Sequence, residues 1–412
     1  MKKYMSLFLV LYCLLTACLG CGIEEYKAIG KQMANGNREN TERKTAKIEA
    51  DSETESIVEP ENTEESESVQ ETESMIEEAD ISYAQNYAYT TLDDTTKIVY
   101  HEVLDTILQH KEKVKVSTLD LEVLENAYDA VCADYGGLFW VSGYVYTQYT
   151  LAEKLIDMEF TPKYTMSCQE REQIQQQVDM AAEKFLEGIS AVDTDYDKAK
   201  HVFDVLIKNV DYDISAEQNQ NIMSVFLNRA TVCQGYACAT QYLLEKLGIQ
   251  STIVKGYVNG ESHAWNLVRL NGKYYYMDTT WGNSRYKDAS RETEKYVNYS
   301  YMLVSSEEIS KTHVLDNSFP LPECSSMSHN YFVREGLYFS TWNPEAVGTV
   351  LKEAWDANEQ GISLKFSSPE LYEQVITYFV TEQHIADYCE SISSIYYIED
   401  AEQYVINFQF NI

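Results

Sequence analysis

The residue best suited to nucleophilic chemistry is Cys233, which lies where a loop gives way to an amphipathic helix. Apolar side chains recur at helical spacing from Tyr236 to Leu247, and Gly248 is a typical helix stop. Cys233 therefore sits in or just before the first turn, where unpaired backbone N–H groups and the positive end of the helix dipole favour a thiolate. A lone cysteine in an apolar helix is more often a small core residue, so the interpretation depends on partner side chains elsewhere.

A base for this cysteine is expected from a β-hairpin further along the chain. Residues 262–270 and 273–278 have strand-like patterns, and the Asn271-Gly272 pair between them is the strongest short hairpin signal that a sequence can carry. A two-residue turn pairs Leu270 with Lys273. It thereby fixes the register of the whole hairpin, provided that no bulge intervenes.

That register brings a histidine and a carboxylate together. Trp265 is predicted opposite Asp278. His263 lies on the same face, opposite Thr280, so it is a diagonal neighbour of Asp278 at about 7–8 Å between backbones. Asp278 can then accept a hydrogen bond from one ring nitrogen of His263 while the other nitrogen faces Cys233, which is the cysteine version of a catalytic triad. In isolation, His263 would more often be a structural histidine and Asp278 a turn or cap acceptor.

Metal binding is the alternative chemistry for these residues. Cys233, Cys238 and His263 offer zinc ligands, but the cysteine spacing lacks the second ligand pair that is typical of zinc sites. In a helix, Cys233 and Cys238 have Cα atoms about 8–9 Å apart, which is too far for a disulfide. The sequence also has no acidic loop of the calcium-binding type. We therefore expect neither a metal nor a cofactor.

Three short blocks around these residues resemble a known family. Val232–Ala237, Ser262–Asn266 and Tyr276–Gly282 resemble the signature blocks of the transglutaminase-like superfamily, a branch of the papain-like cysteine enzymes. The resemblance extends with lower specificity over residues 196–336. One departure is Thr231, which stands where the family often has glycine and whose side chain would tighten the approach to the nucleophile.

The resemblance implies roles and a fold. It implies Cys233 as nucleophile, His263 as base and Asp278 as the orienting acid. Trp265 and Trp281 match aromatic positions of the pattern and are expected to wall the substrate-binding site. The implied fold class is α+β, with the nucleophile helix packed on an antiparallel sheet. The backbone N–H of the nucleophile is the natural oxyanion donor. A second donor stays open among three upstream side chains, Tyr212, Gln218 and Gln220.

The N-terminus resembles a lipoprotein leader. Residues 1–17 contain two lysines, an apolar run too short to span a bilayer and then small residues, which is typical of a secretory signal peptide. The motif ending at Cys18 resembles the lipobox of bacterial lipoproteins, so Cys18 is expected to carry a lipid anchor, with Cys21 as a weaker second candidate. The expected location is the extracytoplasmic face of the cell membrane. The alternative is a soluble secreted protein.

Acidic residues dominate the composition. The formal net charge of −34 argues against a nucleic-acid partner, which would be repelled. Between Glu49 and Asp80 there is no Lys or Arg, while Glu, Ser and Thr dominate. Residues 18–80 are therefore predicted to be the lipid anchor followed by a disordered acidic linker. The nine cysteines are irregularly spaced, which favours few or no disulfides.

Three folded regions are expected after the linker. Residues 81–190 are predicted to be mostly helical, with one aromatic-rich hairpin, and residues 191–337 to form the transglutaminase-like core. Residues 338–412 are predicted to form a small α+β domain of αβαββ order. The two flanking regions carry no side-chain pattern that indicates chemistry.

These expectations combine into one functional hypothesis and one alternative. We expect a cell-surface cysteine acyl-transfer enzyme that cross-links or hydrolyses amides of a protein or cell-wall peptide substrate through a Cys-His-Asp triad. The alternative is a non-catalytic, surface-anchored binding or scaffold protein with the same fold. Loss of a triad residue would favour the alternative, and none is lost. The sequence does not distinguish an amine from water as the acceptor.

Overall fold

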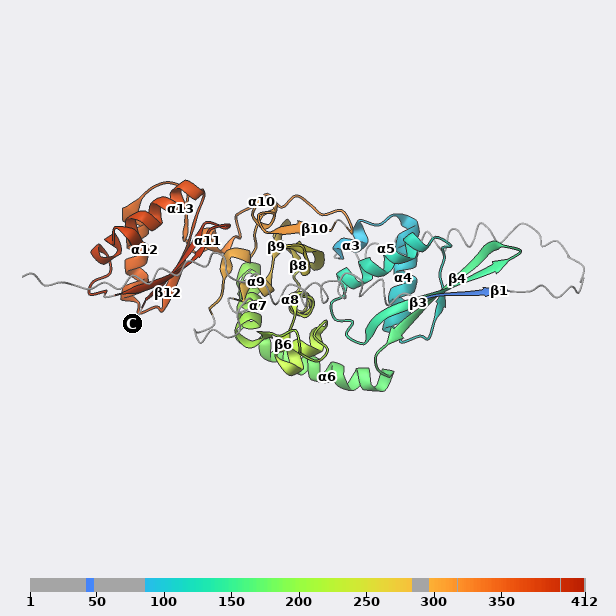
Figure 1. Cartoon of the computed structure of the whole chain (residues 1–412). Helices are drawn as coiled ribbons and strands as arrows, with labels where there is room; N and C mark the ends of the chain where they lie inside the picture. Colours follow the sequence, from blue (N-terminus) through green and yellow to red (C-terminus); the bar gives the residue numbers. More distant parts are fainter. Residues whose placement is uncertain (1–41, 48–85, 284–295, 317, 393, 411–412) are drawn as a thin grey trace, which may run out of the picture.

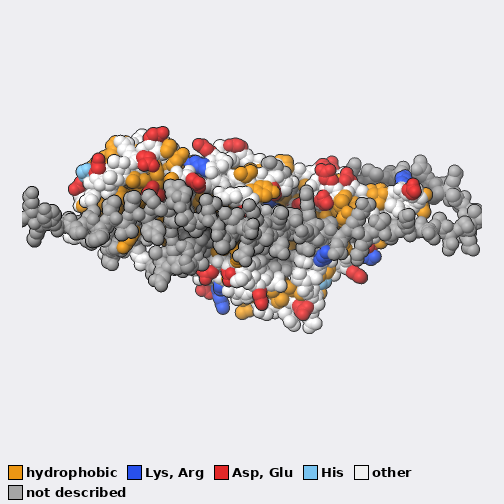
Figure 2. All heavy atoms as spheres, viewed as in Figure 1, with side chains coloured by type: hydrophobic (Ala, Val, Ile, Leu, Met, Phe, Trp, Pro, Cys, Tyr) orange, Lys and Arg blue, Asp and Glu red, His pale blue; other side chains and the backbone are white. Residues whose placement is uncertain are grey.

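The computed structural model describes residues 42–47, 86–283, 296–316, 318–392 and 394–410. These residues form an elongated molecule in which an N-terminal region, a central core and a C-terminal domain follow one another along the long axis (Figure 1). The expected signal peptide and the lipid-anchor residue Cys18 lie outside the described residues. Within the described ranges, no helix has the length and apolar character needed to cross a bilayer. Acidic side chains are spread over the face of the molecule in Figure 2, and basic ones are fewer.

The N-terminal region combines three helices with a four-stranded sheet. Asp93 and Asp120 begin the two long helices, because their carboxylates accept hydrogen bonds from the N–H groups of Thr96 and Glu122. The sheet has the order β1-β3-β4-β2, and its central hairpin extends to one end of the molecule (Figure 1). The elements are α3 (Tyr87–Thr90), α4 (Asp94–Leu108), α5 (Leu121–Asp134), β1 (Glu42–Lys47), β2 (Val114–Lys115), β3 (Val141–Leu151) and β4 (Lys154–Tyr164).

Strand β1 corrects one boundary of the predicted linker. Glu42–Lys47 pair in parallel with β3, although they fall inside the range 18–80 that we expected to be disordered. The acidic composition behind that prediction begins only at Glu49, whereas the strand contains three basic residues. The open edge of β3 also offers backbone groups that an extended segment can pair with. The rest of residues 18–80 lies outside the described residues.

The central core packs α8 against an antiparallel sheet. The sheet has the order β10-β7-β8-β9, and α8 lies on β7 and β8. This is the α+β arrangement that the sequence predicted. The helices are α6 (Cys168–Phe185), α7 (Asp195–Asn209), α8 (Cys233–Lys246), α9 (Thr279–Gly282), α10 (Ser306–Ile309) and α11 (Tyr331–Arg334), with a π-helical turn at Ser224–Asn228. The strands are β5 (Asp211–Tyr212), β6 (Ala230–Thr231), β7 (Ser251–Val258), β8 (Glu261–Leu270), β9 (Lys273–Met277) and β10 (His313–Leu315).

The β8–β9 hairpin has the predicted register. Leu270 pairs with Lys273, and Asn266 pairs with Met277, with no bulge between them. The Asn271-Gly272 turn has φ values of 49° and 77°, which a type I′ turn requires at both central positions. Local turn chemistry therefore sets which residues of the two strands face each other.

Strand β9 ends earlier than expected. Its pairing stops at Met277, and Thr279–Gly282 form the short helix α9 with Asp278 as the N-cap. The predicted pairings of Trp265 with Asp278 and of His263 with Thr280 are therefore wrong. The carboxylate of Asp278 accepts hydrogen bonds from the first N–H groups of α9, and this local bonding replaces continued strand pairing. Asp278 nevertheless lies beside His263 and accepts a hydrogen bond from its ring.

The C-terminal domain has the predicted αβαββ order and one additional edge strand. Asn343 and Ser368 cap its two main helices, each followed by a proline in the first turn. Its buried side chains form a hydrophobic cluster of their own. The elements are β11 (Tyr338–Phe339), α12 (Pro344–Asp356), β12 (Gly361–Phe366), α13 (Pro369–Val375), a π-helical turn (Ile376–Thr381), a 3-10 turn (His384–Asp387), β13 (Ile395–Asp400) and β14 (Val405–Phe410), with the sheet order β11-β12-β14-β13.

Candidate active site

Asp278 is held by the first turn of α9. One carboxylate oxygen, Oδ1, accepts hydrogen bonds from the backbone N–H groups of Thr280 at 2.8 Å and Trp281 at 3.1 Å. A hydrogen bond of 2.9 Å between the hydroxyls of Thr279 and Thr240 ties α9 to the nucleophile helix α8. The side chain of Asp278 is fully buried. Its second oxygen, Oδ2, is consequently fixed in direction and available to other donors.

His263 donates a hydrogen bond to that second oxygen of Asp278. Its Nε2 atom lies 2.7 Å from Oδ2 of Asp278, so the proximity predicted from the hairpin register is confirmed. The imidazole lies at the start of β8 and stacks beside Trp265, with ring centroids 5.8 Å apart and an interplanar angle of 24°. The His263 side chain is 8% exposed, which leaves one edge of the ring close to solvent. The aspartate and the tryptophan therefore fix the plane of the ring.

Cys233 approaches His263 from the start of α8. The cysteine is the first residue of the helix and is 5% exposed, and its thiol lies close enough to His263 to raise the pKa of the imidazole. The structure thus brings all three residues of the predicted triad together, with His263 hydrogen-bonded to Asp278 and Cys233 beside His263. Their catalytic roles remain predictions.

The electrostatics of the site favour a charged pair of His263 and Asp278. Burial alone would lower the pKa of His263, but the charge and hydrogen bond of Asp278, followed by those of Cys233, raise it to about 10. Burial would raise the pKa of Asp278, yet the charges and hydrogen bonds of His263 and then of His313 hold it well below its ordinary range. His263 is therefore an imidazolium and Asp278 a carboxylate at neutral pH.

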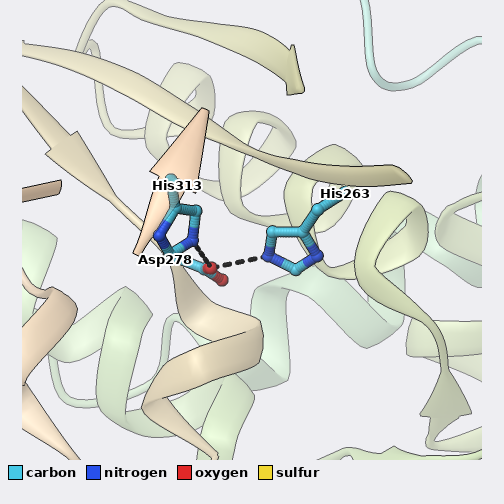
Figure 3. A group of neighbouring side chains, drawn as sticks. All are labelled: His263, Asp278 and His313. Carbon is cyan, nitrogen blue, oxygen red and sulfur yellow. Dashed lines mark hydrogen bonds and ion pairs between the residues drawn. The ribbon is translucent and has the colours of Figure 1, made fainter. Parts of the chain in front are cut away.

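A second histidine, His313, was missed by the sequence reasoning. Figure 3 shows the rings of His263 and His313 approaching the same carboxylate oxygen from two sides. Nε2 of His313 lies 3.0 Å from Oδ2 of Asp278, and its Nδ1 lies 2.7 Å from the hydroxyl of Thr312. The side chain of His313 has no exposed surface. Asp278 consequently accepts hydrogen bonds from two histidines and from two backbone amides.

The short edge strand β10 delivers His313 to this position. His313 pairs with Val258 of β7, and the next pairs along the ladder end at Leu315 and Gly256. A Cβ atom at Gly256 would collide with the backbone oxygen of Val314, so glycine permits this close strand contact. A three-residue strand is too short to show a period-two pattern, and no local signal in the sequence marked His313 as a partner of Asp278.

The two tryptophans lie behind the catalytic residues. Trp265 is 1% exposed and makes an edge-on contact with His313, with ring centroids 4.8 Å apart. Trp281 is 7% exposed and lies 5.2 Å from the ring of His313. Trp265 therefore supports the histidine rings from within the protein and offers almost no surface to a substrate, contrary to our expectation. For Trp281, substrate contact stays a prediction.

The start of α8 differs from an ordinary capped helix. Its N-cap residue is Val232, whose side chain cannot accept a hydrogen bond, so the first-turn amides at Cys233 and Gln234 have no capping side chain. Backbone N–H groups in such a position are suited to stabilising an oxyanion. This arrangement supports the predicted role of the Cys233 amide. The second donor among Tyr212, Gln218 and Gln220 stays open.

Thr231 does not tighten the approach to the nucleophile. Its hydroxyl donates to the backbone oxygen of Asn219 at 2.8 Å and lies 2.7 Å from the hydroxyl of Ser224. The side chain therefore points into the preceding loop. A Cβ atom at Gly235 would collide with the Thr231 hydroxyl, so the glycine in the first turn of α8 accommodates the threonine.

The described residues contain one group whose side chains could jointly reach a metal ion. The ligand atoms of His263, Asp278 and His313 lie within 4.8 Å of one another. Both histidine nitrogens already face the same carboxylate oxygen, so the geometry is that of hydrogen bonding. Cys238, which belonged to the zinc alternative, is not a member of this group and accepts a hydrogen bond from Gln234 at 3.3 Å.

Two curated proteins are similar to part of this chain. Human kyphoscoliosis peptidase is 25% identical to this chain over 141 residues, covering 30% of this chain and 21% of the relative. The mouse protein of the same name is 23% identical over the same length and coverage. This chain thus spans about a fifth of the length of the curated relatives that it matches.

Two solved structures are also similar to parts of this chain. A transglutaminase (TGase) shares 11% identity at a TM-score of 0.25, covering 37% of this chain and 53% of its own. A candidate cysteine protease from Cytophaga hutchinsonii shares 18% identity at a TM-score of 0.22, covering 30% of this chain and 51% of its own. A family model for the transglutaminase-like superfamily matches residues 183–279, a range that includes Cys233, His263 and Asp278. The similarity to the transglutaminase-like superfamily is thus shown for residues 183–279 of this chain.

Proposed function

We propose that the protein is a cysteine acyl-transfer enzyme that acts on amides of a protein or peptide. The observation that carries this proposal is the buried cluster in which His263 is hydrogen-bonded to Asp278 and lies beside Cys233. Cys233 is the nucleophile, His263 is the acid and base, and Asp278 orients the imidazole. The similarity of residues 183–279 to the transglutaminase-like superfamily supports the same assignment.

The geometry supports a two-step reaction. The sulfur of Cys233 attacks the carbonyl carbon of the amide, and the backbone N–H groups at the start of α8 stabilise the oxyanion. The imidazolium of His263 gives its proton to the leaving amine as the C–N bond breaks, which leaves a thioester on Cys233. The neutral imidazole then removes a proton from water or from an incoming amine, which attacks the thioester; the C–S bond breaks, and the thiolate of Cys233 and the imidazolium of His263 are restored.

The acceptor decides between hydrolysis and cross-linking. Water gives a carboxylic acid, and a primary amine gives a new amide. The curated relatives carry the name peptidase, which makes amide hydrolysis the first reaction to test. Transfer to an amine requires that water be excluded while the amine enters.

The proposed location is the extracytoplasmic face of the cell membrane. The support is the leader at residues 1–17 and the lipobox-like motif ending at Cys18. Together with the acidic residues between Glu49 and Asp80, an anchor would hold the enzyme at a distance from the bilayer and near wall peptides. Cys18→Ala is expected to release the protein from membranes into the medium, as measured by fractionation. Unchanged retention would overturn the anchor.

Alkylation and turnover test the proposed chemistry. At about pH 6.5, iodoacetamide should modify Cys233 well before Cys238, because burial raises the pKa of the Cys238 thiol to about 12. Wild-type protein and Cys233→Ala would then be incubated with wall peptides and surface proteins, and the products followed by mass spectrometry. The proposal expects cleaved or cross-linked amides with wild type and with the matched control Cys238→Ala, and none with Cys233→Ala. Products that survive Cys233→Ala would overturn the assignment of Cys233 as nucleophile, and a wild type that forms none would favour a binding protein with this fold.

A further inference from the structure

The C-terminal domain contacts the segment that precedes His313. Glu308 of α10 forms an ion pair with Lys365 of β12, with Nζ and Oε1 3.1 Å apart. The lysine side chain is 1% exposed and the glutamate 11% exposed. An ammonium group this deeply buried is costly unless its partners are fixed, so the pair requires one defined arrangement of the core and the C-terminal domain.

Backbone and aromatic contacts complete the interface. Nζ of Lys365 donates to the backbone oxygen of Gln403 at 2.7 Å, and Nε2 of Gln403 donates to the backbone oxygen of Glu308 at 3.1 Å. The ammonium group of Lys311 lies 4.3 Å from the ring centroid of Tyr404. We call these five residues the docking cluster: Glu308, Lys311, Lys365, Gln403 and Tyr404. The turn between β13 and β14 thus holds residues 308–311 of the core.

The docking cluster lies two residues from the site. The N–H of Thr312 bonds the backbone oxygen of Ile309 at 3.2 Å, so Thr312 continues the turn that Glu308 begins. The Thr312 hydroxyl lies 2.7 Å from Nδ1 of His313, and Nε2 of His313 lies 3.0 Å from Oδ2 of Asp278. Because a carboxylate only accepts hydrogen bonds, Nε2 of His313 carries the proton that Asp278 accepts, while the Thr312 hydroxyl holds the ring at its other nitrogen.

We propose that the C-terminal domain positions the catalytic aspartate, with His313 as the positioning residue between the docking cluster and Asp278. The docking cluster fixes residues 308–311, Thr312 fixes the orientation of the His313 ring, and His313 holds the carboxylate that orients His263. The C-terminal domain, which lies outside the family match at residues 183–279, therefore contributes to the geometry of the active site. This inference rests on the proposed role of Cys233 as nucleophile.

The role of His313 is tested by the rate at which iodoacetamide alkylates Cys233 in the full-length protein, a readout that needs no substrate. His313→Leu is expected to slow alkylation about tenfold or more, the usual effect of losing such a supporting hydrogen bond. His313→Gln keeps an N–H donor at a similar distance and is expected to recover most of the rate. A rate that is unchanged in His313→Leu, or equally slow in both variants, would overturn the positioning role.

The role of the C-terminal domain is tested with two lysines. Lys365→Met removes the buried charge at similar length, while Lys352→Met removes an exposed lysine, 51% exposed, from helix α12 of the same domain. We expect slower alkylation of Cys233 in the first variant, by about threefold to tenfold, and no change in the second. Thermal unfolding identifies a variant that has simply lost its fold. In that case Glu308→Gln, which keeps the shape of the partner, replaces Lys365→Met.

A double variant decides whether the effect passes through His313. If it does, Lys365→Met in the His313→Leu background slows alkylation no further, because coupled residues are non-additive. Additive losses would mean that the docking cluster acts by another route and would overturn the inference. Failure of wild-type Cys233 to react in preference to Cys238 would instead overturn the proposed function. The two failures are therefore distinguishable.

Discussion

Helices α7 and α8 lie side by side in the core and begin in opposite ways. At α7, Thr194 accepts from the N–H of Asp197, and Asp197 accepts in return from the N–H of Thr194. At α8, Val232 occupies the cap position and has no polar side-chain atom. A missing cap costs about 1 kcal/mol of helix stability. At α8, the first-turn amides beside Cys233 have no capping side chain. The cap of α7 therefore contributes to stability, whereas the uncapped start of α8 is suited to binding a substrate oxyanion.

A third helix start combines both roles. Asp278 caps α9 with one carboxylate oxygen and binds His263 and His313 with the other. We therefore expect substitutions at the cap of α7 to lower mainly stability, and substitutions at the start of α8 and at Asp278 to lower mainly activity.

Asp278→Asn should give the largest loss. Asparagine is a good N-cap, so α9 should still form, but the amide cannot supply the charge that holds His263 as an imidazolium. We expect the turnover number kcat to fall by about a thousandfold or more. Steady-state kinetics on the substrate found for the wild type measures this. Asp197→Asn, in the capping box of α7, is the matched control and should retain activity; equal losses in the two variants would contradict the distinction between the caps.

The pH dependence of stability should be the next largest effect. The pKa of His263 is raised from 6.5 to about 10, so its contribution is complete below pH 6.5 and is lost as the pH rises through about 10. The pKa of Asp278 is lowered from 3.8, so its contribution is complete above pH 3.8 and is lost only in stronger acid. The pair therefore stabilises the fold most between pH 3.8 and 6.5.

Urea unfolding at several pH values checks this expectation. The free energy of unfolding should fall between pH 6.5 and 10 by an amount on the order of a few kcal/mol. His263→Ala has no imidazole to titrate and should show a flatter profile over that range. Parallel profiles for the two proteins would mean that the alkaline loss of stability arises elsewhere.

Val232→Thr should have a smaller effect that changes activity more than stability. The added hydroxyl has nearly the shape of the lost methyl group and can accept from the first-turn amides of α8. We expect kcat to fall about tenfold or more, because the hydroxyl competes with the substrate oxyanion. The free energy of unfolding should change by less than about 1 kcal/mol. Val202→Thr in α7, which is equally buried, is the control for a hydroxyl in the core and should leave kcat unchanged.

Local chemistry made the main contacts of the site predictable. The Asn271-Gly272 turn determines the register of β8 and β9, and a period of two then places His263 on the face beside Asp278. The end of β9 was missed because Asp278 also caps a helix, and a cap can end a strand early. The prediction that His263 and Asp278 lie together still holds, because the strands keep the predicted register up to Met277 and the chain turns into α9 only at Asp278.

Contacts between distant segments were not predictable from the sequence. His313 reaches Asp278 from a strand of three residues, which is too short for a periodic pattern. No local signal in the sequence marks Lys365 as buried, and its ammonium group bonds Glu308 and the backbone oxygen of Gln403, which belong to other segments. Such contacts depend on how whole domains pack, and turn and cap signals carry no information about that packing.

Thr194→Ala should produce the smallest functional effect and completes the comparison. Removing the capping hydroxyl of α7 should lower the free energy of unfolding by about 1 kcal/mol, as measured in urea, while kcat and the alkylation rate of Cys233 stay unchanged. Ser167→Ala, in the capping box of α6, should behave in the same way. Slower alkylation in either variant would mean that a stabilising cap also affects the site, because α7 contacts both α8 and α9. Unchanged alkylation would show that, among these helix starts, only the uncapped start of α8 and the cap at Asp278 affect the reactivity of Cys233.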